Sequence, residues 1–352
     1  MKFFKRRAWV FIALAVLLFA LLTIFVARTP FASGTPTPTQ SASDAPAEQA
    51  VIVIPLAGPA ANANAEFSGL AWAGDNLILL PQYPNRFGAG DGALLAIAKA
   101  DLLAHLDGAR TDAITPRAIP LHAPGLAQRV AGFEGYEALA FVDDQVFLTI
   151  EAKPGAMLGN LVKGKLAPDA NRIEIDAATL TPIQPQAGIS NFSDETIVVT
   201  KNKLLTLYEA NGATVNPQPV AHVFDFKPAP LGTIPFPHVE YRLTDATPTD
   251  AADRFWAINY FFTGDTKILP LADPLAARFG KGKTHAQFSH VERLVEFQFS
   301  AAGITLTETP PLQLVLPNGD ARNWEGVARL DKRGFLIVTD AFPKTILGFV
   351  PQ

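Results

Sequence analysis

The stretch that decides the fold is Phe133–Lys153, with the sequence FEGYEALAFVDDQVFLTIEAK. It predicts two strands joined by a tight Asp-Asp turn, because runs of apolar and β-branched residues flank two turn-forming aspartates. A carboxylate leads the first strand and Glu151 ends the second. Since a tight turn makes the two strands antiparallel, the start of the first and the end of the second lie side by side.

Weaker copies of this two-strand unit recur along the chain, and further strand-sized segments follow each copy. Four strands per repeat are typical of a β-propeller. The sequence therefore predicts an all-β propeller of five blades, or of six if residues 154–190 or 262–290 hold a degenerate blade. A β-sandwich is the alternative architecture. The copies are FSGLAWAGDNLILLPQ from Phe67, DETIVVTKNKLLTLYEANG from Asp194, YRLTDATPTDAADRFWAINYFFTGD from Tyr241 and NWEGVARLDKRGFLIVTD from Asn323.

The last repeat is one strand short, and the start of the globular domain can supply the missing strand. The β-branched run VIVIPL at 51–56 has the composition of a strand. Pairing it with the last blade would join the two ends of the domain and close the ring, which leaves few exposed strand edges. Short helices are expected only in loops, at 101–108 and 273–280, each closed by a glycine.

Residues 1–27 have the pattern of a transmembrane helix. Lys2, Lys5, Arg6 and Arg7 precede an apolar run from Ala8 to Val26, which is long enough to cross a hydrocarbon core of about 30 Å. The basic cluster places the N-terminus in the cytoplasm, so we expect a membrane-anchored protein whose globular domain lies outside it, periplasmic or extracellular. A small-residue site at Ala32-Ser33-Gly34 leaves cleavage, and hence secretion, open.

Composition narrows the function classes further. Residues 28–50 are rich in Thr, Pro, Ser and Ala and predict a disordered linker, which leaves 51–352 as the propeller domain. A formal net charge of −4 argues against a nucleic-acid partner, because phosphate binding requires a basic surface. The chain contains no cysteine, which excludes disulfides, thiolate catalysis and zinc-thiolate sites.

Carboxylates recur at corresponding places in the repeats. Four acids lie where an inner strand begins, and Glu151, Glu209 and Asp340 lie where a second strand ends. Both places open on the same face of a propeller, so the acids should gather at one mouth, where oxygen ligands would suit Ca²⁺ or Mg²⁺. The alternatives are solvated acids or pairing with Arg242. The predicted metal ligands are Glu134, Glu137, Glu195 and Glu325.

Two further groups are candidates for binding and catalysis. The segment 263–290 should overhang the mouth, and its cations would suit a small anionic substrate; a solvated surface loop is the alternative. His238 and Glu240 are expected on one strand face as an acid–base pair, against the alternative of a lone loop histidine. The candidate substrate-binding residues are Lys267, Arg278, Lys283 and His285.

The stretches EGYEALAF (134–141), WEGVARLDKRGFLIVTD (324–340) and FSGLAW (67–72) resemble the phytase-like, or esterase-like, propeller proteins of bacteria. This resemblance implies an exported propeller, often calcium-dependent in its enzymatic members, that acts on phosphate or carboxylic esters. It carries Glu134, Glu137 and Glu325 over as metal-site residues. Ser68 and Arg242 depart from the pattern, so the first and fourth repeats lack the acid.

These observations lead to one leading hypothesis and one alternative of another class. The leading hypothesis is a membrane-tethered, divalent-cation-dependent hydrolase of phosphate or carboxylic esters. The alternative is a non-catalytic propeller that binds a ligand or a surface partner. A glycan-processing propeller is a third reading, which rests on acidic pairs and aromatic residues alone. Whether the protein is an enzyme stays open at the level of the sequence.

Overall fold

The computed structural model describes residues 45–317 and 321–352. Residues 45–352 form one compact unit with its own core. The predicted transmembrane helix and most of the predicted linker lie outside the described residues. Within the described part of the chain, no helix is long and apolar enough to cross a membrane.

The first three repeats each form four strands joined in chain order by antiparallel pairing. Blades 1 and 2 are also joined at their outer edges, where β10 pairs with β6 in parallel and produces one eight-stranded sheet. Blade 1 consists of β3 (Phe67–Ala73), β4 (Asn76–Pro81), β5 (Ala93–Ala98) and β6 (Arg117–His122). Blade 2 consists of β7 (Phe133–Val142), β8 (Gln145–Ala152), β9 (Leu158–Leu166) and β10 (Ile173–Ile183). Blade 3 consists of β11 (Asp194–Val199), β12 (Leu204–Tyr208), β13 (Val220–Phe224) and β14 (Pro230–Pro235).

Two strands from the start of the described chain pair with strands of the last two repeats. In blade 5, β2 pairs antiparallel with β22, so a strand from the beginning of the unit completes the last blade as predicted. In blade 4, β1 adds in parallel to β19, and both β18 and β19 pair with β17. Blade 4 consists of β15 (Arg242–Ala246), β16 (Arg254–Phe261), β17 (Val291–Ser300), β18 (Gly303–Leu306), β19 (Leu312–Leu314) and β1 (Glu48–Gln49). Blade 5 consists of β20 (Trp324–Leu330), β21 (Gly334–Thr339), β22 (Leu347–Pro351) and β2 (Ile52–Ile54).

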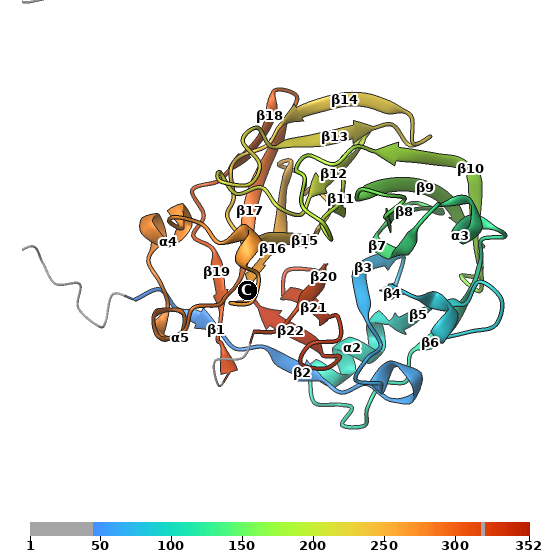
Figure 1. The fold of residues 1–352 in the computed structure, drawn as a ribbon. Coiled ribbons are helices and arrows are strands. Elements are labelled where there is room, and N and C mark those ends of the chain that lie inside the picture. Colours follow the sequence, from blue (N-terminus) through green and yellow to red (C-terminus); the bar gives the residue numbers. More distant parts are fainter. Residues whose placement is uncertain (1–44, 318–320) are drawn as a thin grey trace, which may run out of the picture. The chain divides into compact units, whose positions relative to one another are not determined.

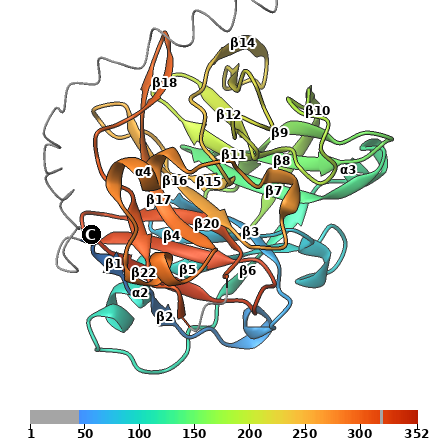
Figure 2. The same ribbon diagram turned by 60° about the vertical axis from the view of Figure 1, so that its left-hand side comes forward.

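The innermost strands β3, β7, β11, β15 and β20 pack side by side in that order, and β20 returns to β3. Figures 1 and 2 show these strands at the centre of the unit, with the outer strands of each blade radiating from them. No extra blade arises at the two places considered. Residues 154–190 hold β9 and β10 of blade 2, and residues 262–290 hold short helices.

The helices of the described residues lie in loops between strands. The two that the sequence predicted are α2 (Lys99–Leu106) and α4 (Pro274–Phe279). Asp273 caps α4, because its side chain accepts the backbone N–H groups of Leu275 and Ala276. The others are α3 (Leu126–Arg129), α5 (Lys283–Gln287) and the 3-10 turns η1 (Gly58–Ala61), η2 (Pro84–Arg86) and η3 (Thr266–Ile268).

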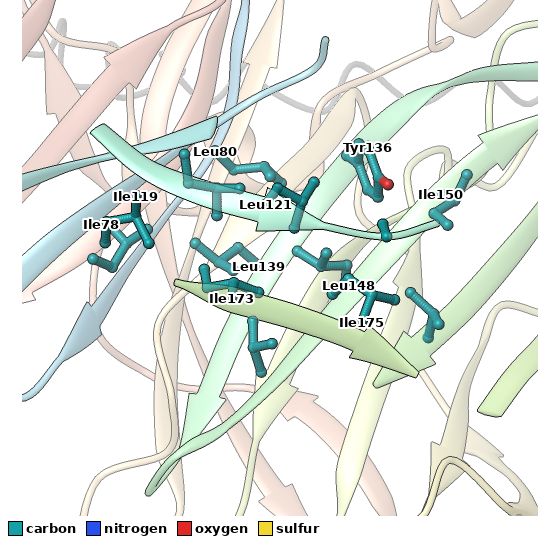
Figure 3. Packing of buried hydrophobic residues seen from close by; sticks show 14 of the residues in the cluster. Ile78, Leu80, Ile119, Leu121, Tyr136, Leu139, Leu148, Ile150, Ile173 and Ile175 are labelled. Atoms are coloured by element: carbon teal, nitrogen blue, oxygen red, sulfur yellow. The ribbon is translucent and has the colours of Figure 1, made fainter. Parts of the chain in front are cut away.

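The core is divided among the interfaces between neighbouring blades. Because side chains alternate across a strand, each blade presents one apolar face to each neighbour. Figure 3 shows the cluster between blades 1 and 2, which includes Leu80 and Leu121 of blade 1 and Leu139 and Leu148 of blade 2. Comparable clusters fill the interfaces of blades 2 and 3, 3 and 4, 4 and 5, and 5 and 1. Full burial of each such side chain contributes about 1.5–3 kcal/mol, so these clusters hold the ring together.

Candidate functional site: an acidic cavity

A β-bulge interrupts each inner strand near the end where it begins. In blades 1, 2, 3 and 5 a bulge leaves Ser68, Glu137, Glu195 and Glu325 respectively out of the pairing, and blade 2 has a second break that leaves out Glu134. In blade 4 the break lies deeper, between Leu243 and Ala246. A bulge re-aims the side chain of its extra residue, and the four side chains that it re-aims in blades 1, 2, 3 and 5 line one cavity.

A second set of polar residues stands at the ends of the second strands. Gln82 follows β4, Glu151 ends β8 and Asp340 follows β21, and all three line the same cavity. Gln82 donates a hydrogen bond of 2.9 Å from Nε2 to Oε1 of Glu137, which ties the two sets together across blades 1 and 2. Glu209, which follows β12, is fully buried beside Arg242.

The cavity has a volume of about 150 Å³ and receives side chains from all five blades. Six of its lining side chains are carboxylic acids and one is an arginine. All four predicted metal ligands are among them, so the predicted gathering of these acids is what the structure shows. The lining residues are Ser68, Gln82, Tyr83, Glu134, Glu137, Glu151, Asn191, Glu195, Arg242, Asn323, Glu325 and Asp340.

Sequence reasoning did not place Gln82, Asn191 or Asn323 in the site. Gln82 holds the place in blade 1 that Glu151 holds in blade 2, so alignment of the repeats would have found it. Asn191 and Asn323 lie just before inner strands. Asparagine is common in turns, so its presence there does not distinguish a site residue from an ordinary turn residue.

Among the described residues that line the cavity, Arg242 is the single cation, and it is already paired. Its guanidinium forms an ion pair with Glu209 and another with Asp265, where Nε lies 2.6 Å from Oδ2. It also stacks over the ring of Phe192 at 4.4 Å. Burial is the largest single effect and opposes its charge, but the acidic groups around it, Glu209 first among them, together outweigh burial and raise the pKa of Arg242 above its usual value. Arg242 therefore pairs with two acids outside the lining set, and within residues 45–317 and 321–352 the four predicted ligands form no ion pair.

Burial changes the ionisation of the cavity acids. It raises the pKa of Glu137, Glu195 and Glu325 well above the usual value, and nearby carboxylates add to the effect. Burial likewise raises the pKa of Glu151 and of Glu209 to about 7. Like charges removed from water repel one another, so near neutral pH the cavity retains protons that a bound cation could displace.

The oxygen atoms of the site match the chemistry of a hard divalent cation. In the described part of the chain, Oε1 of Glu151, Oδ1 of Asp340 and Oδ1 of Asn323 are buried and lack a hydrogen-bond partner. Carboxylate and amide oxygens are the ligands that Ca²⁺ takes. Among residues 45–317 and 321–352, however, no three His, Asp or Glu side chains already stand in a metal-ligating arrangement. The donors fit Ca²⁺ in kind, and binding would require their carboxyl groups to turn towards one point.

We expect the stability of fragment 45–352 to fall as the pH rises in the presence of a chelator. The folded state holds protons on Glu151 and Glu209 up to about pH 7, whereas the unfolded chain releases them near pH 4.3. Raised carboxyl pKa values therefore stabilise the fold at low pH, and this stabilisation is lost as the pH rises through the folded pKa. Urea unfolding at pH 5, 6, 7 and 8 measures the slope.

The Glu151→Gln variant provides the comparison for that slope. The free energy of unfolding should fall between pH 5 and pH 8 in both proteins. Because glutamine does not titrate, the fall should be smaller in the variant than in the parent, by about 1 kcal/mol or more. Parallel curves for the variant and the parent would show that Glu151 does not retain a proton.

The predicted acid–base pair does not form. His238 and Glu240 lie in the loop before β15 and not on one strand face. His238 is exposed, and its Nε2 lies 3.2 Å from the carbonyl oxygen of Pro217. Glu240 is buried, and its Oε1 accepts the backbone N–H of Ala213 at 3.1 Å. The backbone at Val239 serves a loop and not a strand, since the Val239 N–H donates to the carbonyl oxygen of Asn211.

The four basic residues predicted to bind substrate do not line the cavity. Arg278 forms an ion pair with Glu308, and Lys283 is exposed at the start of α5. His285 is buried; its Nδ1 lies 2.8 Å from Glu48, and its Nε2 accepts the backbone N–H of Glu292. Lys267 contacts Ser190, the neighbour in sequence of the lining residue Asn191, and is therefore the one of the four tied to the edge of the site.

Comparisons with known proteins give similarity to solved structures only. No protein-family model and no curated protein matches the chain. A glucose dehydrogenase is similar at 11% identity and a TM-score of 0.44, covering 86% of this chain and 99% of that one. The soluble aldose sugar dehydrogenase of Escherichia coli is similar at 12% identity and a TM-score of 0.43, with coverage of 86% and 99%. A glycosyl hydrolase from Bacteroides ovatus is similar at 10% identity and a TM-score of 0.44, with coverage of 89% and 92%.

The arrangement of blades and the cavity together define the class of protein. It is a mostly β protein of propeller architecture, with an acidic cavity at the mouth of the ring of inner strands. Because no family model matches, the resemblance to phytase-like or esterase-like propellers stays a prediction.

Proposed function

We propose that the acidic cavity binds a divalent cation, Ca²⁺ in the first instance, and that the protein uses it to hydrolyse an anionic phosphate or carboxylic ester. One observation carries the proposal: among the described residues, six carboxylic acids and one arginine line a cavity of about 150 Å³, and that arginine is already paired with two other acids. Such a concentration of acid must hold protons or take up a cation.

The lining residues have distinct roles in this proposal. Glu137, Glu195 and Glu325 would supply carboxylate oxygens from blades 2, 3 and 5, and Glu134, which is exposed, would add a charge at the rim. When bound, the cation would supply positive charge that draws the anionic ester into a cavity that otherwise repels it.

Glu151 is the candidate general base and acid. Its pKa of about 7 and its free Oε1 suit a group that exchanges protons near neutral pH. A water oxygen would form a bond to phosphorus or to the acyl carbon, and its proton would pass to Glu151. As the bond to the ester oxygen breaks, Glu151 would return that proton to the departing alcohol.

Hydrolysis of two chromogenic esters tests the proposal. Fragment 45–352 should hydrolyse p-nitrophenyl phosphate, or the anionic carboxylic ester mono-p-nitrophenyl succinate, at a saturating concentration of free Ca²⁺ or Mg²⁺, and chelation should remove the activity. Activity that persists unchanged in chelator would contradict a role for the cation. Absence of activity in the presence of bound Ca²⁺ would favour the alternative below.

The alternative is a non-catalytic propeller that binds a small ligand or a surface partner at the same mouth. It is favoured by one observation: no histidine is among the described residues that line the cavity, and Ser68 is the only hydroxyl side chain there besides Tyr83. A cation bound without turnover of either ester would select this alternative.

We also propose that residues 8–27 anchor the protein in a membrane and that the propeller lies outside the cytoplasm. The support is the unbroken apolar run after a basic cluster. The full chain should sediment with membranes and resist an alkaline wash, and protease added to intact spheroplasts should digest its propeller. Fragment 45–352 is the soluble control. A full chain found in the soluble cytoplasmic fraction would contradict the anchor.

A further inference from the structure

Several large apolar side chains that face solvent lie in loops that are tied to lining residues of the cavity. The described residues include seven such exposed side chains, and four of them lie in two loops that follow second strands. Single exposed apolar residues are common on proteins. A group of them in adjacent loops at one cavity indicates a contact surface instead. We call the four residues Phe262, Leu269, Leu271 and Phe342 the apolar rim.

The rim loop of blade 4 is held against the cavity at two points. The N–H of Asp265 donates to the carbonyl oxygen of Phe262, and the Asp265 carboxylate binds Arg242, which lines the cavity. Ile268 is buried in a cluster with Phe192 and Phe261 beneath the loop. The next apolar residues of the loop find no such cover: Leu269 is 59% exposed and Leu271 is 94% exposed.

The rim loop of blade 5 is tied to the same cavity. The carbonyl oxygen of Phe342 accepts the N–H of Asn323 at 3.0 Å, and Asn323 is a lining residue. Asp340, two residues before Phe342, also lines the cavity. Phe342 itself is 58% exposed. Since blades 4 and 5 are neighbours, their inner strands β15 and β20 being in contact, the two loops belong to one sector of the mouth.

The size of the cavity indicates what the rim contacts. A volume of about 150 Å³ accommodates a cation and a small anionic group but little more. The remainder of an ester substrate would have to leave the cavity across its rim. Acids line the inside, whereas the blade 4 and blade 5 sector outside offers apolar side chains, so an apolar substituent would gain from lying there.

We infer that the substrate is an ester whose anionic head enters the cavity and whose apolar alkyl or aryl arm lies on the apolar rim. The inference rests on the proposed function, because the anionic head depends on a bound cation. It makes Leu271 and Phe342 specificity-determining residues that do not touch the reacting atoms.

Calorimetric titration of fragment 45–352 in saturating Ca²⁺ with methyl phosphate and with hexyl phosphate tests the inference. Each buried methylene strengthens binding by about fourfold. The rim leaves part of the chain in water, so we expect hexyl phosphate to bind at least about tenfold more tightly. Leu271→Ser and Phe342→Ser should each reduce this preference by about threefold or more, with the affinity for methyl phosphate unchanged. Leu231→Ser is the matched control, since Leu231 is 54% exposed but lies on the outer strand β14.

The outcomes separate the inference from the proposed function. Heat from Ca²⁺ with equal affinity for the two phosphates would overturn the rim and leave the cation site standing. The inference would also be overturned if both rim variants kept the preference for hexyl phosphate, or if Leu231→Ser reduced that preference as much as the rim variants do. No heat from Ca²⁺ and no binding of either phosphate would remove the proposed function and the inference together.

Discussion

Replacing Glu137 and Glu325 together by glutamine should lower the cation-dependent ester hydrolysis of fragment 45–352 by about 100-fold or more. The two acids reach the cavity from blades 2 and 5, each from a bulge in an inner strand. Loss of groups that merely support a metal ligand costs about 10–100-fold in affinity or activity, so loss of two ligands should cost at least as much. The measurement is the initial rate over a series of free Ca²⁺ concentrations.

The control for this experiment is the double variant Glu174→Gln/Glu308→Gln. Both residues are exposed acids outside the lining set, and the variant removes the same two formal charges from the sequence as the test variant. It should retain the parental rate. Because burial raises the pKa of Glu137 and Glu325, their neutral glutamine replacements should not destabilise the fold in chelator. A rate that is the same for the test and control variants would remove these two acids from the site.

Replacing Arg242 by methionine should lower the free energy of unfolding at pH 7 by about 3–5 kcal/mol. Arg242 is the partner of two buried acids, Glu209 and Asp265, and removal of one side of a buried ion pair leaves charge uncompensated. Urea unfolding measures the change. The additional substitution Glu209→Gln should restore part of the lost stability, because it removes one of the two orphaned charges.

The matched control for Arg242 is Arg278→Met. Arg278 is paired with Glu308 on the surface, where an ion pair contributes about 0–1 kcal/mol. The control should therefore differ little from the parent. If Arg242→Met costs no more than Arg278→Met, Arg242 does not balance the acids behind the cavity.

Much of the fold could be predicted because the repeats combine two local signals. Short runs of apolar and β-branched residues mark the strands, and Asp, Asn or Gly turns mark their ends, so Phe133–Lys153 already predicts β7 and β8. The completing strand β2 was predictable because the last repeat lacks a fourth strand. The parallel pairing of β10 with β6 was not, since it joins two blades through only a few residues and leaves no periodic signal.

The candidate site was predictable where it depends on strand ends and unpredictable where it depends on loops. Glu137, Glu195 and Glu325 gather because the repeat fixes each at the same bulge. The segment 263–290 has no repeat to fix it, and side-chain pairing decides where its charges lie. His285 is accordingly buried against Glu48 at blade 4, a contact between residues far apart in the sequence that spacing cannot reveal.

The central claim is that the acidic cavity binds a divalent cation, and a calorimetric titration of fragment 45–352 with Ca²⁺ at pH 7 tests it most directly. Two buffers of different ionisation enthalpy reveal whether binding releases protons. We predict a saturable heat from a single site and a rise in Tm with Ca²⁺ concentration. The observed binding enthalpy should differ between the two buffers, because the buffer takes up the protons that binding releases. The Glu137→Gln/Glu325→Gln variant should lose all three. No heat and no change in Tm for the parent protein would contradict the account.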